Sequence, residues 1–256
     1  MRLYQNIKVI SIAALLSAIA LVDFVTLIQP ASALPTEGTL IARAGRRRLS
    51  FRTGVRPSLY RVGGFSRSSE CGNQQMLTAV VPPPQAQESL SAQKSAIDKT
   101  TAEHPTFFVS LPSLPAGTAQ FTLQDEAGRK ELYNVNFKVT GKPGIVGISL
   151  PSSAPALQVG QKYFWQMAVA CDPNQPLNRS SIGSWVERVN APTATKDERV
   201  STLAAQGIWY DVVTLVALQR YQKPNDRAAA DDWETLMQDA GLPQFKQTAI
   251  VQIVRN

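Results

Sequence analysis

The sequence predicts an α+β protein, in which a mainly antiparallel, Ig-like β-sandwich is followed by a C-terminal helical hairpin. Two observations support this fold class. From Met76 to Asn190 the apolar residues recur with a period of two, in short segments bounded by Pro, Gly and Asp, which is typical of half-buried strands. After Asn190 the period lengthens to that of amphipathic helices. We therefore expect a β-sandwich domain at 71–191 and a helical segment at 192–256 that packs on it.

The chain begins with the three parts of a secretory signal peptide. Arg2 and Lys8 precede a mostly apolar stretch at 9–28, and the motif Ala31-Ser32-Ala33 follows it. This order predicts a signal peptide at 1–33 and an exported protein, periplasmic or extracellular. An uncleaved membrane anchor is the alternative, because the apolar stretch has roughly the ~20 residues that span a bilayer. Asp23 inside the stretch and the small residues after it favour cleavage.

The excess positive charge lies in the segment after the signal peptide. The leader contains Arg2, Lys8 and Asp23, so its removal leaves 24 basic and 18 acidic side chains. Residues 43–67 hold no acidic residue and eight of the arginines. This composition predicts a disordered arm at 34–70. We expect any contacts with an acidic polymer or with lipid headgroups to come from its first six arginines, which are Arg43, Arg46, Arg47, Arg48, Arg52 and Arg56. Because export is predicted, nucleic acid is not an expected partner.

Two cysteines, Cys71 and Cys171, are present. In an oxidising compartment an even pair predicts a disulfide, and the period of two places Cys171 on the same inward face as Trp165. Two free thiols are one alternative, and a metal site that uses both thiols with His104 is another. Structural zinc sites usually bring ligands in close pairs such as C-x-x-C, and the chain has no such pair. We predict no metal and no other cofactor.

The strands are predicted in order from the alternation of apolar and polar residues. The segment Asp125-Glu126-Ala127-Gly128 predicts a hairpin turn, with Phe121 and Leu123 facing the core before it. The strand after the turn, at 131–139, places four apolar residues on one face: Tyr133, Val135, Phe137 and Val139. The same alternation predicts two further strands, with inward residues Val146, Ile148 and Leu150, and Tyr163, Trp165, Met167 and Val169.

The only histidine, His104, opens the segment HPTFFVSLP. Alternation places Phe107, Val109 and Leu111 in the core, and places His104, Thr106, Phe108 and Ser110 on the more polar face. Pro105 fits the entrance of a strand, and the neighbouring Glu103 should point to the opposite face. A catalytic histidine needs a nucleophile or an orienting partner. We therefore predict that His104 begins a core strand and that the chain has no catalytic residues.

Three helices are predicted after Asn190. Thr195 and Glu198 have the spacing of a capping box for a short helix that Gly207 ends. An apolar helix follows and stops at Lys223-Pro224, and Asn225 or Asp226 caps the third helix. The third helix carries an inward stripe of Trp233, Leu236, Met237 and Ala240.

Several longer motifs resemble an exported cyanobacterial family known as domain of unknown function 928. Together they cover nearly all of residues 71–242, and they include AEHPTFFVSLP at 102–112, KPGIVGISLP at 142–151, GSWVERV at 183–189 and GIWYDVVTLVALQR at 207–220. The resemblance implies an exported protein with a β domain and a helical tail. It implies no activity and no catalytic residues.

These observations favour a non-catalytic, exported binding or assembly module of the cell envelope with a protein partner. Polyanion binding through the arginine-rich arm is the first alternative. A hydrolase is the less favoured one, and its candidate carboxylates are Asp172, Asp211, Asp231 and Asp232. A cavity shared by His104, Glu103 and one of these carboxylates would favour the hydrolase.

Cleavage of the leader gives the first testable prediction. Export of the full chain should yield a protein that begins at Leu34, because signal peptidases cut after an A-x-A motif. Intact-mass measurement of the exported protein tests this. A mature protein that retains Met1 would show that the apolar stretch is an anchor.

Overall fold

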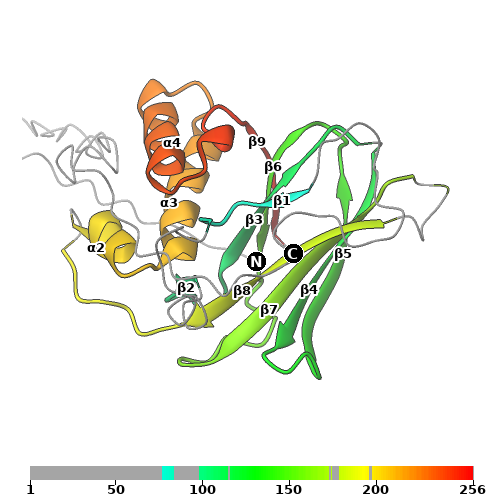
Figure 1. Ribbon diagram of the computed structural model, residues 1–256, viewed down its shortest axis with the longest axis horizontal. Helices are drawn as coiled ribbons and strands as arrows, with labels where there is room; N and C mark the ends of the chain where they lie inside the picture. The colour runs from blue at the N-terminus through cyan, green and yellow to red at the C-terminus, as the bar shows by residue number, and fades with distance from the viewer. Residues whose placement is uncertain are drawn as a thin grey trace, which may run out of the picture. The chain divides into compact units, whose positions relative to one another are not determined.

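The computed structural model describes residues 77–83, 98–114, 116–172, 174, 179–195 and 198–255 (Figure 1). The predicted signal peptide, the predicted arginine-rich arm and Cys71 lie outside the described residues. The described elements belong to one compact unit. No helix in these ranges is long and apolar enough to span a membrane.

The first sheet, sheet A, has four strands in the order β1-β3-β6-β9. Their bounds are Thr78–Ala79 for β1, Thr106–Leu111 for β3, Gly144–Ser149 for β6 and Ile250–Arg255 for β9. Strand β3 is antiparallel to both β1 and β6, whereas β9 is parallel to β6. The chain therefore returns to this sheet after the helices.

The second sheet, sheet B, has five strands in the order β2-β8-β7-β4-β5. Their bounds are Lys99–Thr100 for β2, Gly117–Asp125 for β4, Glu131–Val139 for β5, Lys162–Ala170 for β7 and Arg179–Arg188 for β8. Strand β2 is parallel to β8, and the other pairs are antiparallel. Strands β4 and β5 form the predicted hairpin, in which the backbone N–H of Arg129 donates to Asp125 at 2.8 Å. This bond lowers the pKa of the Asp125 carboxyl below its ordinary value.

Three α-helices and a short 3-10 helix lie between β8 and β9. Their bounds are Arg199–Ala205 for α2, Trp209–Gln222 for α3, Arg227–Asp239 for α4 and Pro243–Phe245 for η2. The predicted cap of α4 is confirmed, because the Asp226 side chain accepts from Ala228 N at 2.8 Å and Ala229 N at 3.2 Å. The predicted end of α2 is confirmed too: Gly207 has a φ of 69°, and Ile208 N donates to Leu203 O at 2.9 Å.

The predicted capping box at the start of α2 is wrong. The helix begins at Arg199, and its N-cap Glu198 makes no side-chain capping hydrogen bond. Thr195 instead donates its hydroxyl to the Glu198 side chain at 2.9 Å. Thr195 and Glu198 thus bond to each other through their side chains and do not cap the backbone of α2.

The β-rich fold with C-terminal helices agrees with the sequence prediction, but the Ig-like antiparallel sandwich is not confirmed. Both sheets are mixed, since β2 and β9 each pair in parallel. The expected helical segment at 192–256 also ends differently, because Ile250–Arg255 forms β9. Four β-branched residues, Ile250, Val251, Ile253 and Val254, favour a strand there.

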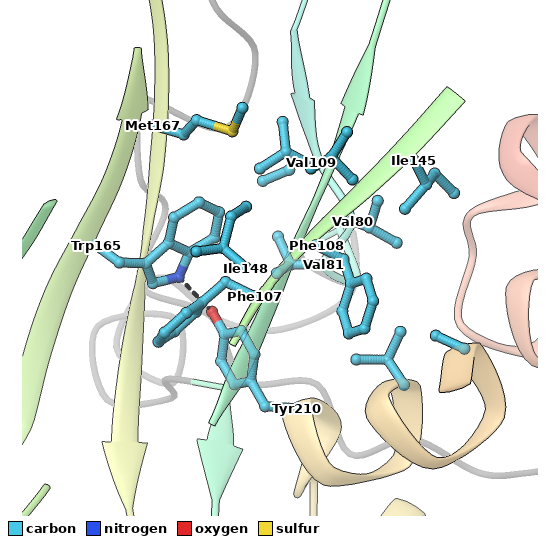
Figure 2. Close-up of a cluster of buried hydrophobic side chains, with 14 of the residues drawn as sticks. Val80, Val81, Phe107, Phe108, Val109, Ile145, Ile148, Trp165, Met167 and Tyr210 are labelled. Atoms are coloured by element: carbon cyan, nitrogen blue, oxygen red, sulfur yellow. Dashed lines mark hydrogen bonds between the residues drawn. The ribbon is translucent and has the colours of Figure 1, made fainter. Parts of the chain in front are cut away.

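The core lies between the two sheets and extends beneath the helices (Figure 2). Phe107 on β3 contacts Phe121 and Trp165 of sheet B, with ring centroids 5.1 and 5.3 Å apart. The predicted inward residues Phe107, Val109, Phe121, Leu123, Trp165 and Met167 are all at most 1% exposed. For these residues the alternation thus identified the face of each sheet that packs against the other sheet.

The position of Phe108 differs from the one that the alternation of apolar and polar residues predicted. It was expected on the polar face, yet it is 1% exposed and points toward helix α3, away from Phe107 (Figure 2). The facing residue on β6 is Gly147, where a Cβ atom would lie 2.8 Å from the Phe108 ring. The helices cover the second face of sheet A, so its central strands are buried on both sides.

The double burial of β3 gives a prediction about stability. Phe107→Ala and Phe108→Ala should each lower the free energy of unfolding by about 3 to 5 kcal/mol, because both rings fill closed space. The neighbouring partly exposed Ser110 offers the control, and Ser110→Ala should change stability by only a few tenths of a kcal/mol. Chemical denaturation measures all three. A cost for Phe108→Ala as small as that of Ser110→Ala would contradict the helix-covered face.

Candidate functional site

A cavity of about 270 Å³ opens between the entrance of β3 and the first turns of α2 and α3. Its polar lining residues are Thr101, His104, Thr106, Arg199, Asp211 and Thr214. They come from three separate segments, which the fold brings together where α3 meets the start of β3. Two residues that the sequence analysis weighed as candidates for catalysis, His104 and Asp211, line the cavity.

Asp211 lies in the first turn of α3, where a negative charge is favourable. Its Oδ1 accepts from the Thr100 hydroxyl at 2.6 Å and from Thr101 N at 3.1 Å. Its Oδ2 accepts from the Thr101 hydroxyl and backbone N–H. Both carboxylate oxygens are therefore occupied, and their bonds hold α3 against the chain that leaves β2.

His104 is partly buried at the edge of the cavity, and its Nε2 lies 3.0 Å from the carbonyl oxygen of Ala154. A carbonyl only accepts, so Nε2 is the donor in this contact. The adjoining backbone is bonded to the same region, since Leu150 N donates to Pro105 O at 3.0 Å. The ring thus helps to hold the strand entrance against the 150–157 connection.

Glu103 does not line the cavity. Its exposed carboxylate pairs with Arg188, whose Nη2 lies 3.1 Å from Oε1. Arg188 also donates to the carbonyl oxygens of Leu157 and Thr101. This arginine therefore fixes the backbone beside the cavity, and Glu103 belongs to that outer arrangement.

The other candidate carboxylates lie elsewhere. Asp172 follows β7 and accepts from Asn174 N at 2.8 Å. On α4, Asp231 is exposed and Asp232 is 2% exposed, and neither lines the cavity. The fold thus brings together His104 and Asp211 from the sequence-based set and separates the rest.

Arg199 is the cavity residue of most interest that sequence reasoning missed. It is the first residue of α2 and is exposed, and its side chain makes no hydrogen bond or ion pair with the described residues. It is also the one Lys or Arg of the lining. Nothing in its local sequence distinguishes it from other surface arginines, because its position depends on how α2 packs beside α3.

The remaining predicted site residues are only partly within the described chain. Cys171 is 8% exposed after β7, which confirms its inward position. Its proposed partner Cys71 lies outside the described residues, so the disulfide stays a prediction. The six arginines of the predicted polyanion contact, Arg43, Arg46, Arg47, Arg48, Arg52 and Arg56, lie outside them as well.

Two further observations limit the chemistry of the described residues. They contain no group of three or more His, Cys, Asp or Glu side chains that could hold a metal ion. A second, more open cavity of about 690 Å³ lies where β3 ends and β6 begins, and Gln244, Phe245 and Thr248 line its other side. None of its lining residues is charged.

Comparison with known proteins identifies the family but no characterised relative. No curated protein sequence matches the chain. Residues 62–250 match the family described as Domain of Unknown Function (DUF928). This match spans strands β1 to β8, the three described α-helices and the whole cavity at α3, and it ends at Ile250, the first residue of β9. The chain therefore belongs to the DUF928 family.

Proposed function

We propose that the protein is a non-catalytic, exported binding module of the cell envelope, and that its cavity at α3 receives a carboxylate of a protein partner. The observation that carries the proposal is the position of Arg199. This cation stands at a cavity whose inner acidic group is already occupied by the protein's own donors. Export and the envelope location are supported by the signal-peptide pattern of the sequence.

The hydroxyl groups of the cavity support binding over nucleophilic catalysis. Thr101 donates to Asp211, Thr106 shares a 2.8 Å hydrogen bond with Ser149, and Thr214 donates to the carbonyl oxygen of Tyr210 at 2.6 Å. A nucleophile must be within reach of a base, but Thr106 and Thr214 bond to a hydroxyl and a carbonyl oxygen. Thr101 does reach the Asp211 carboxylate, but both oxygens of that carboxylate also accept from other donors. The cavity thus offers a preformed polar wall with one available cation.

A carboxylate is the partner group that best matches this wall. The guanidinium of arginine presents several N–H donors in a fixed plane, which suits the two oxygens of a carboxylate. An acidic side chain and a chain terminus both supply that group. Because Arg199 is exposed, we expect a modest contribution to affinity and a dependence on salt concentration.

A hydrolase is the second candidate, and one observation favours it: His104 and Asp211 line the same cavity. In the neutral tautomer that donates from Nε2, the Nδ1 atom of His104 is the acceptor that a general base requires. Against this candidate, both Asp211 oxygens are bonded to Thr100 and Thr101. Polyanion binding by the arginine-rich arm remains a separate proposal, which rests on composition alone.

Arg199 provides a direct test of carboxylate binding. Titration with N-acetyl-glutamate should shift the backbone amide resonance of Thr101 in the folded protein, and Arg199→Gln should weaken the response about five- to tenfold. Arg227→Gln is the matched control, since Arg227 is the exposed first residue of α4 and does not line the cavity. An equal response from the two variants, or no response from the unmodified protein, would refute the proposed site.

A variant at His104 distinguishes the binding proposal from the hydrolase. His104→Ala should fold, lose a little thermal stability with the bond to Ala154, and keep its response to N-acetyl-glutamate. Hydrolysis of a chromogenic ester by the unmodified protein and by this variant is the comparison to make. Turnover that a folded His104→Ala protein lacks would establish the hydrolase instead.

A further inference from the structure

Besides the Arg199 guanidinium, the cavity at α3 presents hydrogen-bond acceptors to a ligand. Asp211 and Thr214 are three residues apart on α3, so they share one face of the helix, and both line the cavity. The Thr214 hydroxyl donates to the carbonyl oxygen of Tyr210, and the Thr101 hydroxyl donates to Asp211. Because a hydroxyl has one proton, these two oxygens can only accept a hydrogen bond from a ligand.

Other side-chain donors of the lining are used within the protein. His104 donates from Nε2 to the carbonyl oxygen of Ala154, and Thr106 shares a hydrogen bond with Ser149 in which either hydroxyl is the donor. Arg199 also lines the cavity, and its guanidinium bonds to none of the described residues. The polar lining thus divides into a cation on α2 and acceptors on α3 and beside β2.

Two opposite charges line this cavity. The Arg199 guanidinium attracts a carboxylate, whereas the Asp211 carboxylate repels one. The donors to Asp211 are hydroxyl and backbone groups, and no described Lys or Arg pairs with it. A ligand therefore fits best when it presents a carboxylate to Arg199 and a hydrogen-bond donor to α3.

The size of the cavity favours the end of a chain. Pockets that enclose drug-sized ligands have volumes of roughly 300–1,000 Å³, and a cavity of roughly 150 Å³ holds one benzene ring. The cavity at α3, at about 270 Å³, lies between these sizes. Its apolar lining includes Ala102, Pro105 and Leu215, which a small aliphatic side chain can contact. A terminal residue brings the rest of its chain on one side, whereas an internal acidic residue brings it on both.

We propose, on the basis of the carboxylate binding inferred above, that the bound group is the C-terminal carboxylate of the partner chain and that its last residue is small and aliphatic. In a C-terminal residue the carboxylate and the backbone N–H are attached to the same carbon atom. One residue thus supplies the acceptor for Arg199 and the donor for the Thr214 oxygen. Capture of a chain terminus by fixed polar groups is a recurring mode of peptide recognition.

Three short peptides distinguish a terminal carboxylate from a side-chain carboxylate. N-acetyl-Ala-Ala has only the terminal one, N-acetyl-Glu-amide has only the side-chain one, and N-acetyl-Ala-Ala-amide has neither. Titration of the full-length protein, or of its mature form, with N-acetyl-Ala-Ala should give a saturable shift of the Thr101 amide resonance. N-acetyl-Glu-amide should bind about fivefold more weakly, because two methylene groups separate its carboxylate from the carbon that carries its N–H. N-acetyl-Ala-Ala-amide should give no shift.

Thr214→Val tests the acceptor on α3. Valine has the shape of threonine without its oxygen atom, so the affinity for N-acetyl-Ala-Ala should fall about three- to tenfold, while that for N-acetyl-Glu-amide should change little. Thr202→Val is the matched control, because Thr202 is a partly exposed threonine of α2 that does not line the cavity. This control should bind N-acetyl-Ala-Ala as the unmodified protein does.

The outcomes distinguish the C-terminal assignment from the carboxylate site itself. Equal or tighter binding of N-acetyl-Glu-amide, or equal affinities of folded Thr214→Val and Thr202→Val, would overturn the assignment and leave the Arg199 site intact. The absence of a shift with both acids, or an equal shift with N-acetyl-Ala-Ala-amide, would refute both. If circular dichroism shows that Thr214→Val is unfolded, the comparison of the three peptides on the unmodified protein decides alone.

Discussion

The hydroxyl group of Tyr210 joins parts of the fold that are distant in sequence. It accepts a hydrogen bond from Trp165 Nε1 at 2.7 Å (Figure 2) and donates to the carbonyl oxygen of Trp185 at 2.9 Å. The same ring packs edge-on against Phe107 of sheet A, with centroids 5.4 Å apart. A buried phenol and a buried indole each need a partner for their polar atom, and this arrangement satisfies both at once. The first turn of α3 is thereby fixed against both sheets.

The residues on either side of Tyr210 extend this constraint. Trp209 donates its indole N–H to the carbonyl oxygen of Val80 at 2.9 Å, which ties α3 to the chain beside β1. Asp211 binds Thr100 and Thr101, which ties it to the chain beside β2. Three consecutive residues thus contact the chain beside β1, the strands β3, β7 and β8, and the end of β2. The cavity at α3 exists because these contacts leave a gap between the helix and the entrance of β3, with Arg199 of α2 beside it.

The sequence predicted the parts of this structure that depend on local periodicity. The hairpin of β4 and β5, the inward residues of β7 and the Asp226 cap all follow from spacing or from a single side chain. The burial of Phe108 did not follow, because alternation along one strand cannot reveal that helices cover its second face. Strand β9 was missed although four of its residues are β-branched, because the segment follows the helices directly and its pairing with β6 is a contact between distant parts of the chain. Only part of the cavity lining could be predicted. His104 and Asp211 were candidates because of their residue types, whereas Thr101 and Arg199 reach the cavity only through tertiary packing.

The parallel pairing of β9 with β6 has a consequence for the order in which the fold forms. Ile145 lies beside Ile250, so the two strands meet across roughly a hundred intervening residues, which include β7, β8 and the three described α-helices. Closing so long a loop is entropically costly, and contacts of high sequence separation slow folding. Sheet A therefore has an open edge on β6 while the rest of the chain is being synthesised. The nascent chain lacks this edge strand until β9 leaves the ribosome, and during that interval chaperones can bind the open edge.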